Sequence, residues 1–154
     1  MKLKLIIISL ILLISGCGKS KTDQNNDLGS GDKSNLPVSL DLLIEHAEYC
    51  ETIYDSGGSQ KDEVAFEVKQ DGGITIIVIR GTANAENVQS DIDVRLVTDD
   101  DLGIRLHKGF RDASVTVMSS IDESSLEKTV HVTGHSLGGA IAQIIGMWLH
   151  KRSH

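Results

Sequence analysis

The chain has 154 residues, of which 40% are hydrophobic and 24% are charged, a size and composition typical of one globular domain. Its 22 acidic residues outnumber its 15 basic ones and give a formal net charge of −7, so a nucleic-acid groove lined by Lys and Arg is not expected. Two cysteines are too few for a disulfide framework or a four-cysteine zinc site, and no CxxC or HExxH spacing occurs. The sequence therefore predicts no metal and no cofactor.

The first sixteen residues have the features of a secretory signal. Lys2 and Lys4 precede an apolar run over residues 5–14, and a Ser-Gly pair follows at 15–16. As a helix, ten residues rise only about 15 Å, half of a bilayer's hydrocarbon core, so a permanent membrane span is not expected. We expect residues 1–16 to be a signal peptide that takes no part in the fold.

Cys17 follows this run directly, and Ile-Ser-Gly-Cys over residues 14–17 resembles a bacterial lipobox. The resemblance implies cleavage before Cys17 and lipid attachment to its thiol, and more than one acyl chain is enough for stable anchoring to a membrane. A plain signal peptide with an incidental cysteine is the alternative. The prediction is a lipoprotein of the cell envelope, with an outer-membrane or surface location preferred because Gly18 and Lys19 lack the aspartate linked to inner-membrane retention.

A polar stretch separates Cys17 from the predicted domain. Residues 18–35 contain Leu28 as their one large apolar side chain, so residues 17–35 are expected to be a lipidated cysteine with a flexible tether. The domain then opens with a helix over residues 40–54, for which Ser39 is a suitable N-cap. Apolar side chains recur in this helix at helical spacing, and they are Leu40, Leu43, Ile44, Ala47, Cys50 and Ile53. Cys50 is expected to be a buried free thiol.

The remaining pattern predicts an α/β domain over residues 36–154. One strand shows alternating polarity and ends in the turn Asp71-Gly72-Gly73, whereas the run ITIIVI is apolar almost throughout, as in a strand covered on both faces. The order of strand, crossover helix, strand and helix predicts a mostly parallel sheet with a right-handed crossover. The predicted elements are an outer strand at 64–69, a central strand at 74–79, a helix at 110–126, a buried strand at 130–133 and a helix at 137–150.

The motif that carries chemistry is Gly134-His135-Ser136-Leu137-Gly138-Gly139, a GxSxG pattern between the buried strand and the last helix. A serine on so sharp a turn adopts a strained backbone conformation, and the glycines allow neighbouring segments to approach without a Cβ clash. The N–H of Leu137 then points to the place where negative charge develops on an attacked carbonyl. We predict that Ser136 is a nucleophile, in preference to a glycine-rich helix start that merely packs tightly.

Four short motifs in this order resemble the class 3 lipases, which are α/β-hydrolases acting on triacylglycerols and related esters. The motifs are Arg80-Gly81-Thr82, Asn87-Val88-Gln89-Ser90-Asp91, His107-Lys108-Gly109-Phe110 and the elbow at 134–139. The resemblance covers residues 38–150 and implies an α/β-hydrolase fold with a lipid or other carboxylic-ester substrate. It also implies that Ser136 is the nucleophile and Thr82 the oxyanion residue beside Leu137. Asp91 and His107 match positions whose role is structural, near the site.

The segment over residues 83–93 departs from the family pattern. This segment occupies the place where the family often carries a lid, but it is polar, and Val88 stands where an aromatic side chain is common. Such a segment would bury little lipid-facing area. We therefore expect soluble or short-chain esters, or phospholipids, rather than fat droplets.

The second departure from the family pattern concerns the catalytic acid and histidine. α/β-Hydrolases place both after the serine, yet no Asp or Glu follows Ser136 in this sequence. A helix from Leu137 would carry His150 about 20 Å from the elbow, with His154 beyond it. Of the remaining candidates, His131 and His135 are expected to be structural, and His46, on the first helix, has only its residue type to recommend it as a base.

These departures predict a C-terminally truncated lipase, of which only the N-terminal part of the fold is present, or a shortened relative without catalysis. Three functions stay open. They are an anchored carboxylic-ester hydrolase, a noncatalytic membrane-anchored lipoprotein that binds lipid, and a transacylase or phospholipase using the same elbow. A sheet that stops after this helix would expose an edge and an apolar face, so residues 17–154 alone are expected to be poorly stable.

Overall fold

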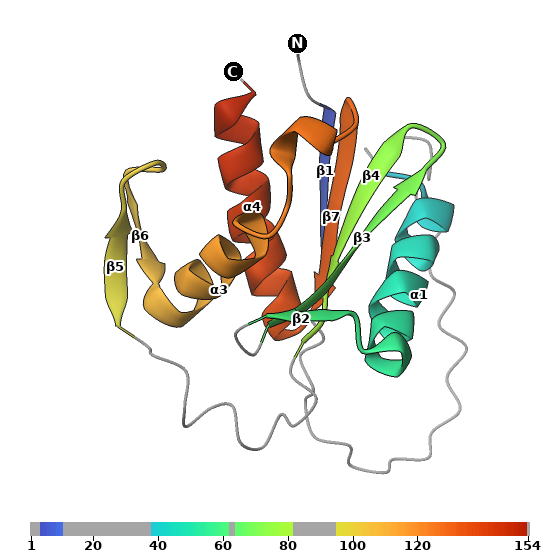
Figure 1. The fold of residues 1–154 in the computed structure, drawn as a ribbon, viewed down its shortest axis with the longest axis horizontal. Helices are drawn as coiled ribbons and strands as arrows, with labels where there is room; N and C mark the ends of the chain where they lie inside the picture. Colours follow the sequence, from blue (N-terminus) through green and yellow to red (C-terminus); the bar gives the residue numbers. More distant parts are fainter. Residues whose placement is uncertain (1–3, 11–37, 62–63, 82–94, 154) are drawn as a thin grey trace, which may run out of the picture.

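The computed structural model describes residues 4–10, 38–61, 64–81 and 95–153 (Figure 1). These residues form a five-stranded sheet in the order β1-β7-β4-β3-β2, a separate two-stranded hairpin and a set of flanking helices. The elements in chain order are β1 (Lys4–Leu10), α1 (Leu40–Ser56), β2 (Ser59–Lys61), β3 (Val64–Asp71), β4 (Ile74–Ile79), β5 (Leu96–Asp99), β6 (Ile104–His107), α3 (Lys108–Met118), the 3-10 turn η2 (Glu123–Ser125), β7 (Thr129–His135) and α4 (Leu137–Arg152).

The centre of the sheet is the parallel pair β4 and β7, and β3 adds to β4 in the antiparallel sense. Side chains of β4 alternate between the two faces. Ile77 and Ile79 belong to the core cluster shared with α3 and α4, whereas Ile76 and Val78 pack with Ile53 of α1. Helices therefore cover both faces, α1 on one and α3 with α4 on the other (Figure 1). This arrangement confirms the predicted α/β class, and the sheet is mixed because β2 and β3 run antiparallel.

Helix α1 begins and ends as its sequence dictates. The Ser39 side chain accepts a hydrogen bond from the Leu42 N–H at 3.2 Å, which confirms the predicted N-cap, and Gly57 ends the helix with a left-handed φ of 76°. The expected apolar stripe is wrong at its start, because Leu40 and Ile44 are 55% and 50% exposed. The buried stripe runs instead through His46, Cys50 and Ile53, and Leu40 and Ile44 fall outside it.

The buried stripe of α1 confirms Cys50 as a buried free thiol. Burial raises the pKa of this thiol, and the contact of Sγ with Oγ1 of Thr133 at 3.4 Å opposes that rise. A thiol held protonated in this way acts as a small packing group.

Helix α3 is shorter than predicted. It ends at Met118 instead of continuing to 126, because the hydroxyls of Ser119 and Ser120 both donate to the Thr116 carbonyl oxygen. Such bonds offer the backbone an alternative to the helix. Inward packing of the helix is confirmed at Val117, which is fully buried.

Strand β1 differs from the expectation that the N-terminal apolar run lies outside the fold. Lys4–Leu10 pairs in parallel with β7, and Ile7 lies opposite Val132. Gly146 of α4 makes room for this strand, since a Cβ there would lie 2.2 Å from Cδ1 of Ile7. A short apolar run fits a strand as well as a helix, and the edge of β7 supplies its backbone partners. Cleavage of residues 1–16 stays a prediction.

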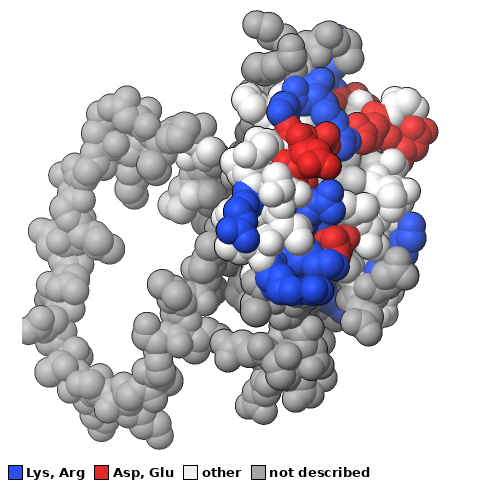
Figure 2. Space-filling model, turned by 90° about the vertical axis from the view of Figure 1, so that its left-hand side faces the viewer, with Lys and Arg blue, Asp and Glu red and all other residues white. Residues whose placement is uncertain are grey.

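The side of the molecule that carries the β5–β6 hairpin shows interspersed basic and acidic side chains (Figure 2). Ion pairs account for part of this pattern, among them Lys108 with Asp112 and Arg152 with Asp101. Within the described ranges, no helix has both the length and the apolar character needed to cross a membrane. Cys17, the tether and the segment 83–93 lie outside these ranges.

Candidate functional site

Ser136 lies where the chain turns from β7 into α4. Its backbone has φ 55° and ψ −122°, and among the described residues it is the only one other than glycine with a positive φ. Such conformations cost about 1–3 kcal/mol and concentrate at functional sites. The residue is exposed, and although it occupies the N-cap position, its side chain makes no capping hydrogen bond. The hydroxyl is therefore presented at the surface and is not used to hold the helix.

Glycines flank Ser136 because backbone segments meet there too closely for a Cβ atom. A Cβ on Gly134 would lie 2.3 Å from the carbonyl oxygen of Gly138, and a Cβ on Gly138 would lie 2.2 Å from that of Ile79. These neighbours are backbone atoms, so rotation of a side chain cannot relieve the clash. The close approach expected from the glycine spacing is present, and it fixes the start of α4 against the ends of β4 and β7.

The first turn of α4 presents backbone N–H groups beside Ser136. The N–H groups of Gly139 and Ala140 donate to the Ser136 carbonyl oxygen at 3.0 and 3.4 Å, whereas Leu137 and Gly138 come before the first N–H that has an acceptor within the helix. A helix N-terminus carries about half a positive elementary charge. This end of α4 can therefore stabilise an oxyanion that forms next to the serine.

Tyr54, which the sequence analysis did not single out, lies next to this elbow. Its hydroxyl oxygen is 3.5 Å from Nδ1 of His135. A Cβ on Gly81 would lie 2.5 Å from that oxygen and 3.4 Å from Cβ of Ser136, so all four residues meet at one place. Burial raises the pKa of Tyr54, which keeps the phenol protonated at neutral pH.

Arg80 joins the end of α1 to the end of β4. Its backbone N–H donates to the Ala65 carbonyl oxygen at 2.9 Å, and its Nη1 donates to the Gly57 carbonyl oxygen at 3.4 Å. The Nε atom is buried and has no partner among the described residues. The guanidinium thus anchors the C-cap of α1 beside the strand that leads to Gly81.

Two of the remaining histidines form a buried pair between α1 and β7. Nε2 of His46 and Nδ1 of His131 are 3.0 Å apart, and the rings are 1% and 4% exposed. Burial, together with the charge that His131 would carry, lowers the pKa of His46 to about 4, although Glu45 acts in the opposite direction. His46 is therefore neutral at physiological pH and packs against His131, while the ring of His135 faces Tyr54.

Of the other predicted site residues, the structure describes His107 and not Thr82 or Asp91, which fall within 82–94. His107 is the N-cap residue of α3, and its ring stacks on Phe110 with 4.4 Å between centroids. Its Nδ1 is buried and has no partner in the described part of the chain.

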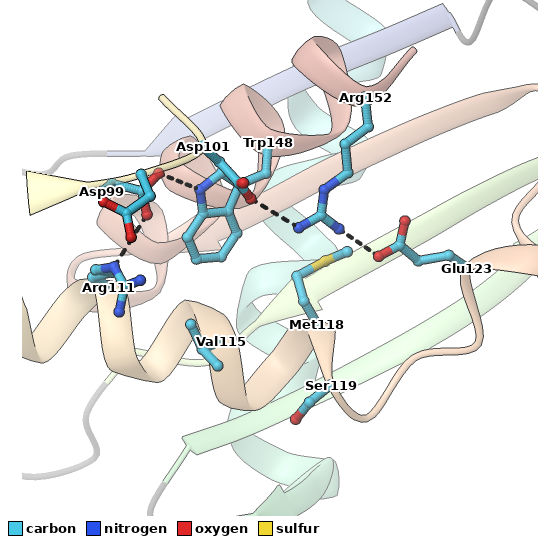
Figure 3. A pocket seen from close by; sticks show the side chains of 10 residues that line it. Asp99, Asp101, Arg111, Val115, Met118, Ser119, Glu123, Trp148 and Arg152 are labelled. Carbon is cyan, nitrogen blue, oxygen red and sulfur yellow. Dashed lines mark hydrogen bonds and ion pairs between the residues drawn. The ribbon is translucent and has the colours of Figure 1, made fainter. Parts of the chain in front are cut away.

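A separate hollow of about 390 Å³ lies at the other end of α4, between this helix, α3 and the β5–β6 hairpin (Figure 3). The polar groups around it are engaged with one another. Asp99 accepts from Nε1 of Trp148 and Nε of Arg111, both at 3.1 Å, and Arg152 bridges Asp101 and Glu123. This hollow does not include Ser136, and both arginines that line it form ion pairs with carboxylates that also line it. No group of three His, Cys, Asp or Glu side chains in the described structure is arranged to hold a metal ion.

In the comparison with protein families, residues 76–154 match the model of Lipase (class 3). The matched region includes most of β4 together with β7, the elbow and α4. A search of curated protein sequences gave no match.

Comparison with solved structures gives fungal lipases. A fungal lipase in an inhibitor complex superposes with a TM-score of 0.55 at 23% identity, covering 71% of this chain and 52% of that protein. A triacylglycerol lipase described as having a serine-protease triad gives 0.56 at 21% identity, covering 76% and 58%. The triacylglyceride lipase of Rhizomucor miehei gives 0.52 at 23%, covering 71% and 52%. The α/β-hydrolase fold is shared, and this chain spans a little over half the length of these lipases.

Proposed function

Because the chain belongs to the class 3 lipase family, we propose that it carries the nucleophile of a serine carboxylic-ester hydrolase acting on lipid esters. The observation that carries this proposal is the backbone of Ser136, with φ 55° at the junction of β7 and α4 and a hydroxyl that caps nothing. A structural serine at a helix start would be expected to cap the helix. Strain maintained at an exposed hydroxyl supports a chemical role.

In the proposed reaction, the Ser136 oxygen attacks the ester carbonyl carbon and forms a bond to it. The carbonyl oxygen becomes negatively charged and is stabilised by the Leu137 N–H at the start of α4, with Thr82 as the second donor. Collapse breaks the bond to the alcohol, which leaves with the proton that the Ser136 hydroxyl gave up. Water then attacks the acyl-enzyme, returns one proton to Ser136 and releases the acid. We assign the base role to none of His46, His131 and His135, since each of these rings faces another partner.

The proposed substrates are soluble or short-chain esters, or phospholipids. This proposal rests on the polar composition of residues 83–93, where Val88 and Ile92 are the only large apolar side chains. A segment with so little apolar surface gains little from contact with a fat droplet. Hydrolysis of p-nitrophenyl acetate and p-nitrophenyl palmitate should differ, with a higher kcat/KM for acetate; the reverse order would contradict this assignment.

The proposed location is the cell envelope, through a lipid on Cys17. The support is the Ile-Ser-Gly-Cys sequence after an apolar run. Metabolic labelling with palmitate should be lost in Cys17→Ser and kept in Cys50→Ser, because the Cys50 thiol is buried. Labelling that survives in Cys17→Ser would contradict anchoring at this residue.

The nucleophile itself is tested by labelling the full chain with a fluorophosphonate, which reacts with an activated serine. We expect one modified peptide containing Ser136, and its loss in Ser136→Ala. Ser120→Ala is the matched control, because Ser120 is also an exposed serine but follows the end of α3 and lies outside the elbow.

Folded protein that is not labelled would contradict the hydrolase proposal. Binding of a fatty acid by the same unlabelled protein would then favour a noncatalytic lipid-binding lipoprotein. Labelling of a serine other than Ser136 would contradict the assignment of the nucleophile.

A further inference from the structure

Helix α1 reaches the proposed active site through one side chain, Tyr54, in its last turn. A Cβ on Gly81 would lie 2.5 Å from its hydroxyl oxygen, and Nδ1 of His135 lies 3.5 Å from the same atom. Gly81 follows β4 and His135 ends β7, so one phenol contacts the ends of both central strands. No backbone hydrogen bond of the β4–β7 ladder can do this, because the paired register of β4 ends at Ile79, opposite Gly134.

The phenol contacts its neighbours through both its hydroxyl and its ring. The hydroxyl oxygen and Nδ1 of His135 are 3.5 Å apart, and the tautomer of the imidazole decides which of the two donates. The His135 ring meets the Tyr54 ring edge to face at 6.4 Å between centroids. Phenylalanine at position 54 would keep this ring contact and lose the polar contact of the hydroxyl.

The contact lies close to the reacting atom. A Cβ on Gly81 would be 2.6 Å from the carbonyl oxygen of His135 and 3.4 Å from Cβ of Ser136, so Gly81 and the elbow are separated by little more than atomic contact. Any displacement of Gly81 therefore changes the space beside Ser136. Misplacement by about 1 Å at a reacting centre can cost 100-fold in rate.

We propose that Tyr54 is a positioning residue for ester hydrolysis at Ser136, holding the end of β4 at a fixed distance from the elbow through the contacts of its hydroxyl with Gly81 and His135. This inference rests on the proposed hydrolase function. It gives α1 a part in the reaction, although no residue of α1 belongs to the motifs that resemble the lipase family.

Tyr49 supplies a matched control on the same helix. Its hydroxyl donates to Oε1 of Glu45 at 2.8 Å, within α1 and not across to the elbow. Tyr49→Phe and Tyr54→Phe thus remove the same atom from neighbouring turns. They differ in whether that atom contacts Gly81 and His135.

The experiment measures fluorophosphonate labelling of Ser136 in the full chain, together with hydrogen exchange of the Gly81 amide by NMR. In Tyr54→Phe we expect the maximal labelling rate to fall about tenfold with unchanged half-saturating probe concentration, and Gly81 exchange to become faster. Tyr49→Phe should match the wild type in both measurements. A lower maximal labelling rate with an unchanged half-saturating probe concentration indicates lost positioning, whereas a change in both indicates a general loss of structure around the site. A urea titration verifies that both variants are folded.

The outcomes separate the two proposals. If the wild type is labelled at Ser136 and Tyr54→Phe is labelled equally fast, the positioning role of Tyr54 is overturned and the hydrolase function stands. If Gly81 exchange does not change in Tyr54→Phe, the contact itself is overturned. If the folded wild type is not labelled, the hydrolase function fails, and the role of Tyr54 in it fails as well.

Discussion

At Gly138 the first turn of α4 runs directly against the end of β4. A Cβ there would lie 2.2 Å from the Ile79 carbonyl oxygen and 2.9 Å from its carbonyl carbon. On helix propensity alone, Gly138→Ala should stabilise α4 by about 1 kcal/mol. The clash with backbone outweighs this, and we predict a net loss of about 1–3 kcal/mol in the free energy of unfolding, measured by urea denaturation.

The control for this prediction is Gln143→Ala, at an exposed position of the same helix. It should change stability by less than about 0.5 kcal/mol. Stability of Gly138→Ala equal to or above that of the wild type would show that α4 can shift away from β4. The elbow would then not depend on this close approach.

The residues around Ser136 could be predicted to different extents. The GxSxG spacing predicted a strained serine between strand and helix, because glycines at fixed offsets report local backbone geometry. Tyr54 had no such signal, since a single tyrosine on an amphipathic helix resembles any half-buried side chain. Its role depends on where the end of α1 meets two strands that lie far from it in sequence, and only the tertiary structure determines that.

Among the elements, the β5–β6 hairpin is attached to α3 and α4 through Asp99. Its carboxylate, 1% exposed, accepts hydrogen bonds from Trp148, Arg111 and the Leu102 N–H. Burial alone would raise the pKa of Asp99, but these three donors together lower it. Asp99→Ala leaves the buried Trp148 N–H without its partner, so we predict a loss of about 2–4 kcal/mol in thermal or urea unfolding.

The neighbouring Asp100 is the matched control, since it is exposed in the same turn. Asp100→Ala should be within about 0.5 kcal/mol of the wild type. Equal stability of Asp99→Ala and Asp100→Ala would mean that the hairpin is not held by this carboxylate.

The junction between α1 and β7 should make stability depend on pH. His46 titrates at about 4 in the folded chain and near its ordinary value of 6.5 when unfolded, so acid protonates the unfolded state first. The stability from keeping His46 neutral is therefore complete above pH 6.5 and is lost as the pH falls toward 4. The loss reaches about 3 kcal/mol below pH 4.

Urea titrations between pH 7 and pH 4 test this dependence. His46→Gln should remove most of it, whereas His150→Gln, at an exposed site near the end of α4, should keep the slope of the wild type. Comparison between variants cancels the titration of the carboxylates. An identical slope in His46→Gln and the wild type would contradict the low pKa of His46.

Elements with a long, regular pattern were predicted best. The apolar run of β4 and the helical spacing of α4 were found within two residues of their ends, because burial on both faces leaves a continuous signal. The β5–β6 hairpin was missed. Each of its strands has only four residues, and both strands mix apolar side chains with polar or charged ones, among them Asp, Arg and His. Strands so short carry too few alternations to be recognised.

At the scale of the whole molecule, the N-terminal apolar run has the sequence pattern of a signal segment but forms a strand of the sheet. Residues 5–14 have the composition of a signal peptide's apolar segment, and the sequence alone could not show that part of this run fits an open sheet edge. β1 contacts both β7 and α4, and Ile7 lies in the space left by the missing side chain of Gly146. In a chain of residues 17–154 alone, β7 lacks this partner strand, and the edge that β1 occupies is free to pair with another chain.

We therefore predict that residues 17–154 are less stable than the full chain by on the order of 2–4 kcal/mol, through the loss of β1 and of the apolar contacts it makes. The freed edge should also cause self-association that increases with protein concentration in analytical ultracentrifugation. Gly146→Leu in residues 1–154 keeps every N-terminal residue but fills the space beside Gly146 that Ile7 occupies. It should therefore reproduce the loss of stability, although leucine has a higher helix propensity than glycine. If residues 17–154 stay monomeric, unfold at the same urea concentration as the full chain and keep the β7 amides protected from exchange, β1 contributes nothing to the fold.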